Sequence, residues 1–261
     1  MALKTLLLDL DGTVYFGEAE VPGASAFIRH CNGRGIRSLF VTNRSNRPPV
    51  VVRDQLRAYG IPCETEDVLT SGQATARYLR SGSVYMIGEE GLELAFREQG
   101  IRVVTDPDER PDAVVVSYDR GITYEKIAAA SRWIGEGVRF VATNTDKSLR
   151  VNGRRLPGTG TFVCAVQAAS GDVEPEVVGK PERLIFDMAL DIAGCAADEA
   201  LAIGDNLRTD IGAANRAGIP SVLLMTGLHT AADIVPGGPT PTYCIADYAE
   251  LTRLVDSLSA S

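Results

Sequence analysis

Segments typical of strands and helices alternate along the whole chain, and this alternation is the feature that most restricts its fold. Short apolar segments such as "KTLLLDL" (residues 4–10), "IRSLFVTN" (36–43) and "ALAIGD" (200–205) are typical of buried strands. Segments of helical character lie between them, for example residues 124–134 and 207–218. Strands that alternate with helices favour a mainly parallel sheet. We therefore predict an α/β fold built on a doubly wound parallel sheet.

Polar residues gather at the ends of several predicted strands, and their spacing indicates how the chain is organised. These clusters lie near residues 9–13, 42–44, 180 and 204–210. In a doubly wound sheet, ligands bind beyond the carboxyl ends of the strands, so we expect the clusters to converge. The stretch between the second and third clusters has strand and helix segments of its own. We therefore predict a Rossmann-like core formed by residues 1–78 and 177–261, with a smaller α/β cap inserted at residues 79–176.

The charge and cysteine content restrict what the protein binds. The net charge is −8, with acidic and basic residues interspersed, which argues against a nucleic-acid or membrane surface. An anionic ligand would have to be held by local basic groups. The cysteines are scattered and form no CxxC pair, so they indicate neither a zinc site nor a disulfide framework. The sequence shows no signal peptide and no membrane-spanning run, and we expect a cytoplasmic protein.

The stretch "LLLDLDGTVY" (residues 6–15) ends an apolar segment with two carboxylates, Asp9 and Asp11. Burying two charges of the same sign is costly, so such a pair needs a cation, a shared proton or exposure in a turn. In an exposed turn the two would be ordinary capping acids. Beside a cation, Asp9 suits a metal ligand and a nucleophile, and Asp11 suits a general acid and base.

A second apolar segment, "ALAIGDNLRTD" (residues 200–210), also ends in carboxylates. Asp205 follows the predicted strand directly, at the place where a cation ligand is expected. Asp210 falls near the first turn of the next predicted helix, where it would orient the metal ligands or simply favour the helix dipole. We place Asn206 and Asp210 among the residues that surround the metal ligands.

Two further segments contain groups that suit phosphate. "FVTNRS" ends the second predicted strand with Thr42 and Asn43, followed by Arg44, and such polar groups bind phosphate oxygens. "VVGKP" places Lys180 just before a proline that is typical of a helix start. There the ammonium would reach a phosphate or neutralise the carboxylates. By itself, the first segment also fits an ordinary turn, and Lys180 in the second also fits a solvated surface lysine.

In this order, "DLDGT", "VTN", "GKP" and "GDNLRTD" resemble the four motifs of the haloacid dehalogenase superfamily of phosphotransferases. The spacing leaves room for a large cap between the second and third motifs. Together with "FVATNTD" and "LPGTGTF", the pattern resembles the subfamily with an α/β cap at that place, the class IIA cap. This subfamily includes NagD-like and p-nitrophenyl phosphatases. The likeness extends over essentially the whole chain.

The resemblance implies a phosphatase with a defined role for each matched residue. Asp9 would form an aspartyl-phosphate, while Asp11 would protonate the leaving alcohol and then activate water. Thr42 and Lys180 would hold the phosphoryl group. The substrate would be a small phosphorylated metabolite, such as a sugar phosphate, a nucleoside monophosphate or phosphoglycolate.

The resemblance also implies where a Mg²⁺ cofactor binds. The ligands would be Asp9, the backbone carbonyl of Asp11, and Asp205, with Asp210 behind them. The sequence leaves open whether the protein forms a homodimer.

The residues that would recognise the leaving group lie in the predicted cap. "ATNTD" (residues 142–146) ends a cap strand, and the resemblance makes Asn144 and Asp146 candidates for substrate selection. Two other functions remain open, namely a phosphoaspartate signalling protein and a phosphomutase. The acidic pair on the first strand and the large insertion argue against a signalling receiver.

Overall fold

Two compact units make up the structure, a computed structural model that describes residues 3–151 and 154–259. The first unit consists of Met1–Thr42, Val50–Leu69 and Lys180–Ser261, and the second of Asn43–Pro49 and Thr70–Gly179. The predicted boundary after residue 78 falls within helix α3 (Ser71–Leu79), which packs in the second unit. The chain re-enters the first unit at Lys180, which is the third polar cluster of the sequence.

The first unit is built on a six-stranded sheet with the order β15-β14-β13-β1-β4-β5. Its strands are β1 (Thr5–Leu8), β4 (Arg37–Thr42), β5 (Val68–Thr70), β13 (Ala200–Gly204), β14 (Ser221–Leu224) and β15 (Tyr243–Ile245). β1 is central and parallel to both neighbours, with Leu6 level with Leu201 of β13 and Ser38 of β4. All residues of β1 are buried, as expected for a parallel strand that is covered on both faces.

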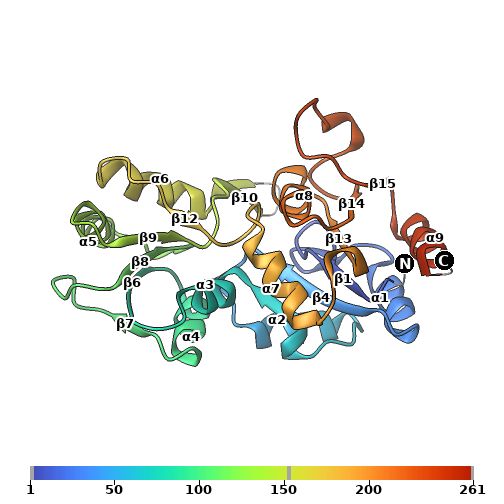
Figure 1. The fold of residues 1–261 in the computed structure, drawn as a ribbon, viewed down its shortest axis with the longest axis horizontal. Coiled ribbons are helices and arrows are strands. Elements are labelled where there is room, and N and C mark those ends of the chain that lie inside the picture. The colour runs from blue at the N-terminus through green and yellow to red at the C-terminus, as the bar shows by residue number, and fades with distance from the viewer. Residues whose placement is uncertain (1–2, 152–153, 260–261) are drawn as a thin grey trace. The chain divides into compact units, whose positions relative to one another are not determined.

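Helices pack against this sheet and give the first unit its layers (Figure 1). α1 (Ala24–Gly33), α2 (Pro49–Ala58) and α9 (Tyr248–Ser259) share one apolar core with Leu6 and Leu8 of β1. α7 (Leu184–Ala193) contacts β1 and β4, and α8 (Gly212–Ala217) packs against α7. The prediction of a doubly wound α/β core is confirmed.

The strand order of this sheet changes direction at β1. After β1 the chain adds β4 and β5 on one side, and later β13, β14 and β15 on the other. The carboxyl ends of β1 and β13 therefore flank the point of reversal, which is where open α/β sheets bind ligands. Asp9 follows β1 and Asp205 follows β13 at this point.

The second unit contains a separate five-stranded parallel sheet with the order β12-β9-β8-β6-β7. Its strands are β6 (Ser83–Ile87), β7 (Arg102–Val104), β8 (Ala113–Val116), β9 (Arg139–Ala142) and β12 (Glu176–Val177). In Figure 1, α5 (Tyr124–Gly135) and α6 (Thr159–Ala169) lie on one side of these strands, and α3 and α4 (Glu90–Glu98) on the other. The prediction of a smaller α/β unit with its own sheet is confirmed.

Several elements differ from the sequence-based expectation. The sequence pattern does not indicate the hairpins β2–β3 (Tyr15–Phe16, Ala19–Glu20) and β10–β11 (Ser148–Val151, Arg154–Pro157), nor helix α4. Strands of two to four residues are too short to show a clear alternation. Thr70 caps α3, because Thr70 and Gln73 bond each other's backbone N–H in a capping box. α7 begins at Leu184 rather than at Pro181.

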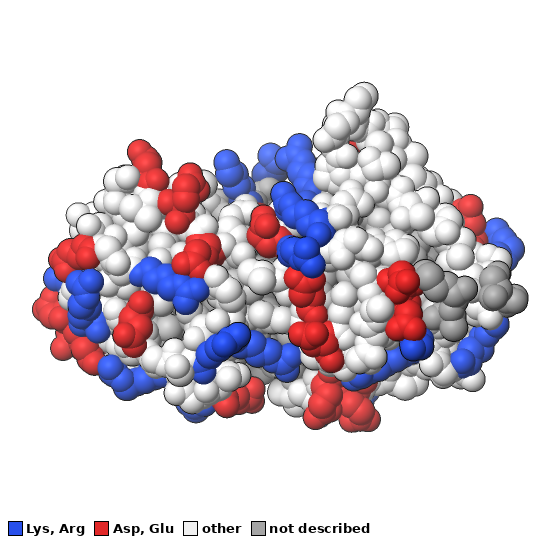
Figure 2. Space-filling model, viewed as in Figure 1, with Lys and Arg blue, Asp and Glu red and all other residues white. Residues whose placement is uncertain are grey.

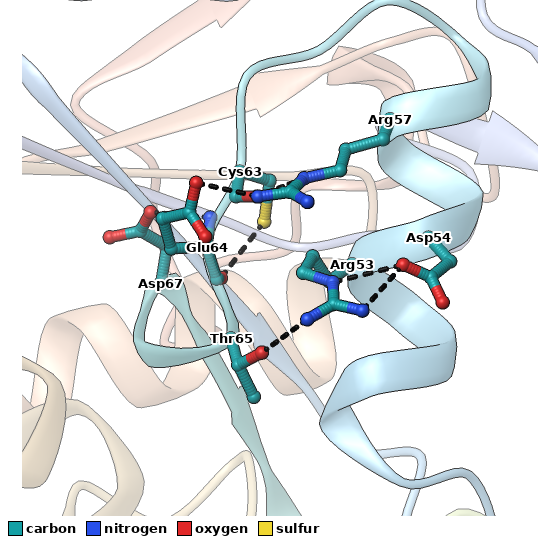
Figure 3. A network of polar contacts seen from close by, with 7 residues as sticks. All are labelled: Arg53, Asp54, Arg57, Cys63, Glu64, Thr65 and Asp67. Atoms are coloured by element: carbon teal, nitrogen blue, oxygen red, sulfur yellow. Dashed lines mark hydrogen bonds and ion pairs between the residues drawn. The ribbon is translucent and has the colours of Figure 1, made fainter.

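A polar network ties α2 to the loop that precedes β5 in the first unit (Figure 3). Arg57 Nε donates to the Cys63 carbonyl at 2.7 Å. At the start of β4, Arg37 Nη2 donates to Asp67 Oδ1 of the same loop at 3.0 Å. These bonds fix the edge strand β5 beside β4, whose other end carries Thr42.

Charges of both signs are spread over the surface. On the face shown in Figure 2, Lys and Arg side chains alternate with Asp and Glu, and no broad area of one sign is visible among the described residues. This face provides no extended field that would attract a polyanion. No helix in the described part of the chain has the length and apolar character that a bilayer crossing requires.

Candidate active site

Four charged side chains of the first unit converge at the carboxyl ends of β1 and β13. Oxygen atoms of Asp9, Asp205 and Asp210 lie within 4.8 Å of one another. Lys180 Nζ lies 2.5 Å from Asp9 Oδ1 and 2.7 Å from Asp210 Oδ1. Asp205, Asp210 and Lys180 are only 6%, 3% and 2% exposed. The structure thus brings Asp9 of the first polar cluster and Asp205 and Asp210 of the last together with the lysine of the third.

Asp9 is fixed through its backbone by the sheet. Its N–H donates to the Ile203 carbonyl of β13 at 2.9 Å, which extends the pairing of β1 by one residue. On the other side of β1, Leu8 is level with Phe40, and this register places Thr42 at the same edge of the sheet. Thr42 is buried as the last residue of β4. The predicted nucleophile and the predicted phosphate-binding threonine therefore stand on adjacent strands.

The chain turns sharply after β1, and this turn carries Asp11. The Leu10 carbonyl accepts the N–H of Val14 at 2.8 Å, and Asp11 is half-buried within the loop so formed. Gly12 has a φ of 85°, a left-handed conformation that glycine adopts without strain. A Cβ at Gly12 would also lie 2.2 Å from Asp205 Oδ2. Glycine is thus required here both by its conformation and by the carboxylate packed against it.

Lys180 provides a positive charge at the centre of the carboxylates. Besides Asp9 and Asp210, its ammonium donates to the Val41 carbonyl of β4 at 2.9 Å. Burial alone would lower the pKa of Lys180, but the charges of Asp210 and Asp9 outweigh it and hold the pKa above its usual value. The ammonium therefore stays charged and points in a fixed direction.

Asp210 lies on a π-helical turn, η3 (Leu207–Ile211), which precedes α8; a single helix over residues 207–218 was the expectation. Asn206 caps this turn, with Oδ1 accepting the Arg208 N–H at 2.9 Å. The N–H of Asn206 donates to Asp210 Oδ2 at 3.1 Å. A Cβ on Gly204 would lie 2.4 Å from Asp210 Cγ, so the carboxylate packs directly on the strand end. Both oxygens of Asp210 are thereby engaged, one by Lys180 and one by Asn206.

A loop after β14 encloses Asp205, and the sequence reasoning missed it. The Leu228 N–H donates to Asp205 Oδ2 at 2.7 Å, and a Cβ on Gly227 would lie 2.0 Å from the same oxygen. The Thr226 hydroxyl donates to the Gly12 carbonyl at 2.9 Å. This segment holds the carboxylate through backbone groups and through the absence of a side chain. Such contacts leave no chemical signal in a single sequence.

The charge balance of the cluster fits a divalent cation. Three carboxylates face one ammonium, and burial, followed by the charges of Asp210 and Asp9, raises the pKa of Asp205. Because both oxygens of Asp210 accept hydrogen bonds, Asp9 and Asp205 are the carboxylates best placed to bind a cation directly. Carboxylate oxygens are the ligands that Mg²⁺ prefers in proteins. The donor set and the excess of negative charge both suit this metal.

The remaining predicted site residues pack in the second unit. Asn43 Nδ2 donates to Asp146 Oδ2 at 3.0 Å, and Asn144 Nδ2 donates to the Asn43 carbonyl at 3.0 Å. Arg44 is half-buried in the segment Asn43–Pro49 of this unit. The phosphate-binding role of Asn43 and Arg44 and the recognition role of Asn144 and Asp146 stay predictions.

Known proteins resemble this chain in sequence and in fold. Residues 6–102 match the family model described as haloacid dehalogenase-like hydrolase, and residues 177–251 match one described as HAD-hydrolase-like. The chain is 39% identical over 251 residues to the 5'-nucleotidase YutF of Bacillus subtilis, with 95% of this chain and 96% of that protein covered. The chain belongs to the haloacid dehalogenase-like hydrolases.

Two further similarities locate this hydrolase within the family. The acid sugar phosphatase of Staphylococcus aureus is also 39% identical over 251 residues, covering 95% of this chain and 96% of that protein. The solved structure of NagD from E. coli K-12 has a TM-score of 0.88 at 28% identity, over 96% of this chain and 98% of that one. The resemblance to NagD-like phosphatases with a class IIA cap is confirmed, and this hydrolase is a phosphatase.

Proposed function

We propose that this phosphatase hydrolyses small phosphomonoesters through an aspartyl-phosphate formed on Asp9. The observation that carries the proposal is the contact of Asp9 with the fixed ammonium of Lys180 at 2.5 Å, beside two further carboxylates. Phosphoryl transfer requires that the negative charge of the phosphoryl oxygens be offset in place. Lys180 supplies a permanent positive charge next to the carboxylate that is proposed to attack.

The proposed reaction has two steps. In the first, an Asp9 carboxylate oxygen bonds to phosphorus while the bond between phosphorus and the leaving oxygen breaks, and Asp11 gives its proton to that oxygen. In the second, Asp11 takes a proton from a water molecule, the water oxygen bonds to phosphorus, and the bond to Asp9 breaks. An alcohol and inorganic phosphate are released, and both carboxyl groups return to their starting states.

Asp9, the backbone carbonyl of Asp11 and Asp205 would hold Mg²⁺ in this proposal. Bound there, Mg²⁺ supplies positive charge that neutralises the phosphoryl oxygens. Asp210 acts behind these ligands, because it holds the Lys180 ammonium on one oxygen and the Asn206 N–H on the other. Thr42, at the end of the adjacent strand, is proposed to hold a phosphoryl oxygen.

The relatives narrow the substrate class. Those named 5'-nucleotidase and acid sugar phosphatase support a nucleoside monophosphate or a sugar phosphate, and phosphoglycolate belongs in the same comparison. A panel of these phosphomonoesters, assayed with Mg²⁺ and ranked by kcat/KM, identifies the leaving group that the enzyme prefers.

Replacing Asp9 tests the proposed nucleophile. We expect Asp9→Asn to abolish Mg²⁺-dependent release of phosphate from p-nitrophenyl phosphate, with the circular dichroism spectrum unchanged, since the amide cannot attack phosphorus. Asp11→Ala should slow hydrolysis and lengthen the lifetime of the phosphoenzyme, because both proton transfers lose their carrier.

Two results would contradict this scheme. Wild-type turnover by Asp9→Asn would exclude Asp9 as the nucleophile, and an unchanged rate in Asp11→Ala would exclude the acid–base role. A signalling protein would take up phosphate once without turnover, and a phosphomutase would transfer it to a second alcohol. Multiple turnovers with stoichiometric inorganic phosphate exclude both of these functions.

A further inference from the structure

The chain passes directly from the first unit to the second next to two of the proposed phosphate-binding residues. Thr42 is the last residue of its segment in the first unit, and Asn43 is the first residue of the second. At the return, Gly179 ends the second unit and Lys180 begins the first. Whatever fixes Asn43 and Gly179 within the second unit therefore acts, through one peptide bond, on Thr42 and Lys180.

The Asn43 carbonyl is held by two side chains of the second unit. Ser71 Oγ donates to it at 2.8 Å and Asn144 Nδ2 at 3.0 Å. Ser71 is fully buried, and Asn144 is 3% exposed. A carbonyl with two buried donors has both of its lone pairs satisfied, so the peptide plane after Asn43 has a single orientation.

Gly179 is packed against Asn43. Its N–H donates to the Thr143 carbonyl at 3.0 Å. A Cβ at Gly179 would lie 2.3 Å from that carbonyl oxygen and 2.6 Å from Asn43 Oδ1. The two chain segments that lead to Thr42 and Lys180 are therefore in direct contact inside the second unit.

Asn144 is itself rigidly held. Its Nδ2 also contacts Thr159 Oγ1 at 3.3 Å, at the start of α6, and its Oδ1 accepts the Asp146 N–H at 3.1 Å. The Gly160 N–H then donates to the Asp146 carbonyl at 2.9 Å. The amide thus connects α6 to the Asn43 carbonyl, and its hydrogen-bonding groups are used for this purpose rather than directed at a ligand.

We propose that Asn144 and Ser71 are positioning residues for the phosphoryl-binding site, acting through Asn43 and Gly179 on Thr42 and Lys180. In the first unit, the Lys180 ammonium bonds the Val41 carbonyl, so the same two chain segments are also joined on that side. If the Asn43 carbonyl is held less firmly, Thr42 and Lys180, which are proposed to hold the phosphoryl group, change position. This inference rests on the proposed roles of Thr42 and Lys180, and it replaces substrate recognition as the function of Asn144.

The two functions of Asn144 predict different kinetics. A residue that recognises the leaving group changes KM by a different factor for each substrate and leaves the binding of inorganic phosphate unchanged, because phosphate has no leaving group. A positioning residue lowers kcat by a similar factor for all substrates and weakens the binding of inorganic phosphate. A misplacement of about 1 Å at a reacting centre, caused by a mutation far from it, can slow a reaction about a hundredfold.

The experiment compares Asn144→Ala and Ser71→Ala with the wild-type enzyme in the presence of Mg²⁺. We expect kcat to fall about tenfold or more for both p-nitrophenyl phosphate and a sugar phosphate. Isothermal titration with inorganic phosphate should show a larger dissociation constant for phosphate in both variants than in the wild-type enzyme. Ser131→Ala is the matched control, since Ser131 Oγ donates to the Val166 carbonyl at 3.3 Å and this buried bond of the second unit involves neither crossing. The control should keep wild-type kcat and phosphate affinity.

A double-mutant cycle with Thr42→Ala tests the route of the effect. If Asn144 acts through the phosphoryl site, adding Asn144→Ala to Thr42→Ala lowers kcat by a smaller factor than it does in the wild-type enzyme. If Asn144→Ala lowers kcat by the same factor in the Thr42→Ala variant as in the wild-type enzyme, the inference is overturned. Should Asn144→Ala fail to fold, Ser71→Ala decides the question in the same cycle, because it removes one side-chain hydrogen bond where Asn144→Ala removes three.

Failure of this inference is distinguishable from failure of the proposed function. If Asp9→Asn is inactive while Asn144→Ala and Ser71→Ala keep wild-type kcat and phosphate affinity, only the positioning role is overturned. If Asp9→Asn retains turnover, the proposed function fails first, and the premise of the inference fails with it.

Discussion

The Lys180 ammonium donates to Asp9, to Asp210 and to the Val41 carbonyl. A buried charge of this kind is tolerated only because its partners surround it, and removing one partner of such a group typically costs about 3–5 kcal/mol. The lysine therefore contributes to folding as well as to the proposed chemistry. Arginine would not replace it, since the planar guanidinium does not fit a space shaped for a compact ammonium.

Glycines shape the proposed metal site as closely as the carboxylates do. Gly12 and Gly227 both approach Asp205, and Gly204 supports Asp210. In each case a Cβ would occupy the space of a carboxylate atom, at 2.0–2.4 Å. The position of the acids is thus set by the backbone that surrounds them, which is the kind of support that tunes metal ligands.

We expect Gly227→Ala to weaken Mg²⁺ binding about tenfold or more, because the new methyl group must displace the Asp205 carboxylate. Isothermal titration with Mg²⁺ on the purified protein measures this directly. Gly33→Ala is the matched control, since a Cβ at Gly33 in α1 meets nothing within 4 Å. Equal Mg²⁺ affinities in the two variants would show that Asp205 is not held in this way.

At the scale of elements, the C-terminal helix supports the turn that carries Asp11. Tyr248, the first residue of α9, donates its hydroxyl to the Thr13 carbonyl at 2.8 Å, directly after Gly12. Its ring packs against Phe27 of α1, with ring centroids 5.3 Å apart. Burial raises the pKa of Tyr248, so the phenol remains protonated and continues to donate. The last helix of the chain therefore fixes the first functional turn.

Tyr248→Phe should lower the unfolding free energy by about 1 kcal/mol, because the Thr13 carbonyl loses its donor in a buried place. For a chain of this size, that corresponds to a melting temperature lower by about 2–4 °C. We also expect kcat to fall, since the turn that carries Asp11 is loosened. Tyr124→Phe, the same change at a side chain that is 81% exposed, is the control. A melting temperature and kcat equal to those of the control would refute the supporting role of α9.

The π-helical turn η3 shows why the element boundary matters for the site. A regular α-helix from Leu207 onward would have the same hydrogen-bond pattern as α8. In the wider π-helical turn, the Ile211 N–H instead donates to the Asn206 carbonyl at 3.2 Å. Asp210 thereby lies close enough to the Asn206 N–H to accept it. Such turns are rare and often occur at functional sites.

For the whole molecule, the excess of buried negative charge predicts how stability depends on pH and metal. Burial and neighbouring carboxylates raise the pKa of Asp205 above its ordinary value of 3.8 in the folded state. The folded state then holds a proton that the unfolded state has already released. Stability from this group is fully present below pH 3.8 and is lost progressively as the pH rises above it.

We therefore expect the metal-free protein to melt at a lower temperature at pH 8 than at pH 6, measured by thermal unfolding in EDTA. Mg²⁺ binds the ionised carboxylates, so the rise in melting temperature that it causes should be larger at pH 8. Asp205→Asn should reduce both effects, because the amide does not titrate. A Mg²⁺-induced shift that is the same at both pH values in the wild-type protein would contradict the assignment.

How far the sequence predicts this protein differs between the core and the second unit. Alternating strand and helix segments indicate the doubly wound sheet, because apolar periodicity is a local property of the chain. The polar clusters at strand ends indicate that Asp9, Asp205 and Lys180 converge, since parallel strands present their carboxyl ends at one edge. The hairpins and α4 escape prediction because their segments are short or their pattern is ambiguous.

The sequence by itself determines which chemical groups stand at the strand ends, and with them the family and the class of reaction. The tertiary structure decides how those groups are held: Gly227 against Asp205, Tyr248 on the turn after β1, and Asn144 on the Asn43 carbonyl. These contacts join residues that are far apart in the chain, and they rely on backbone atoms or on a missing side chain. Residue identity carries the chemistry, whereas close approach between distant segments appears only once the chain is folded.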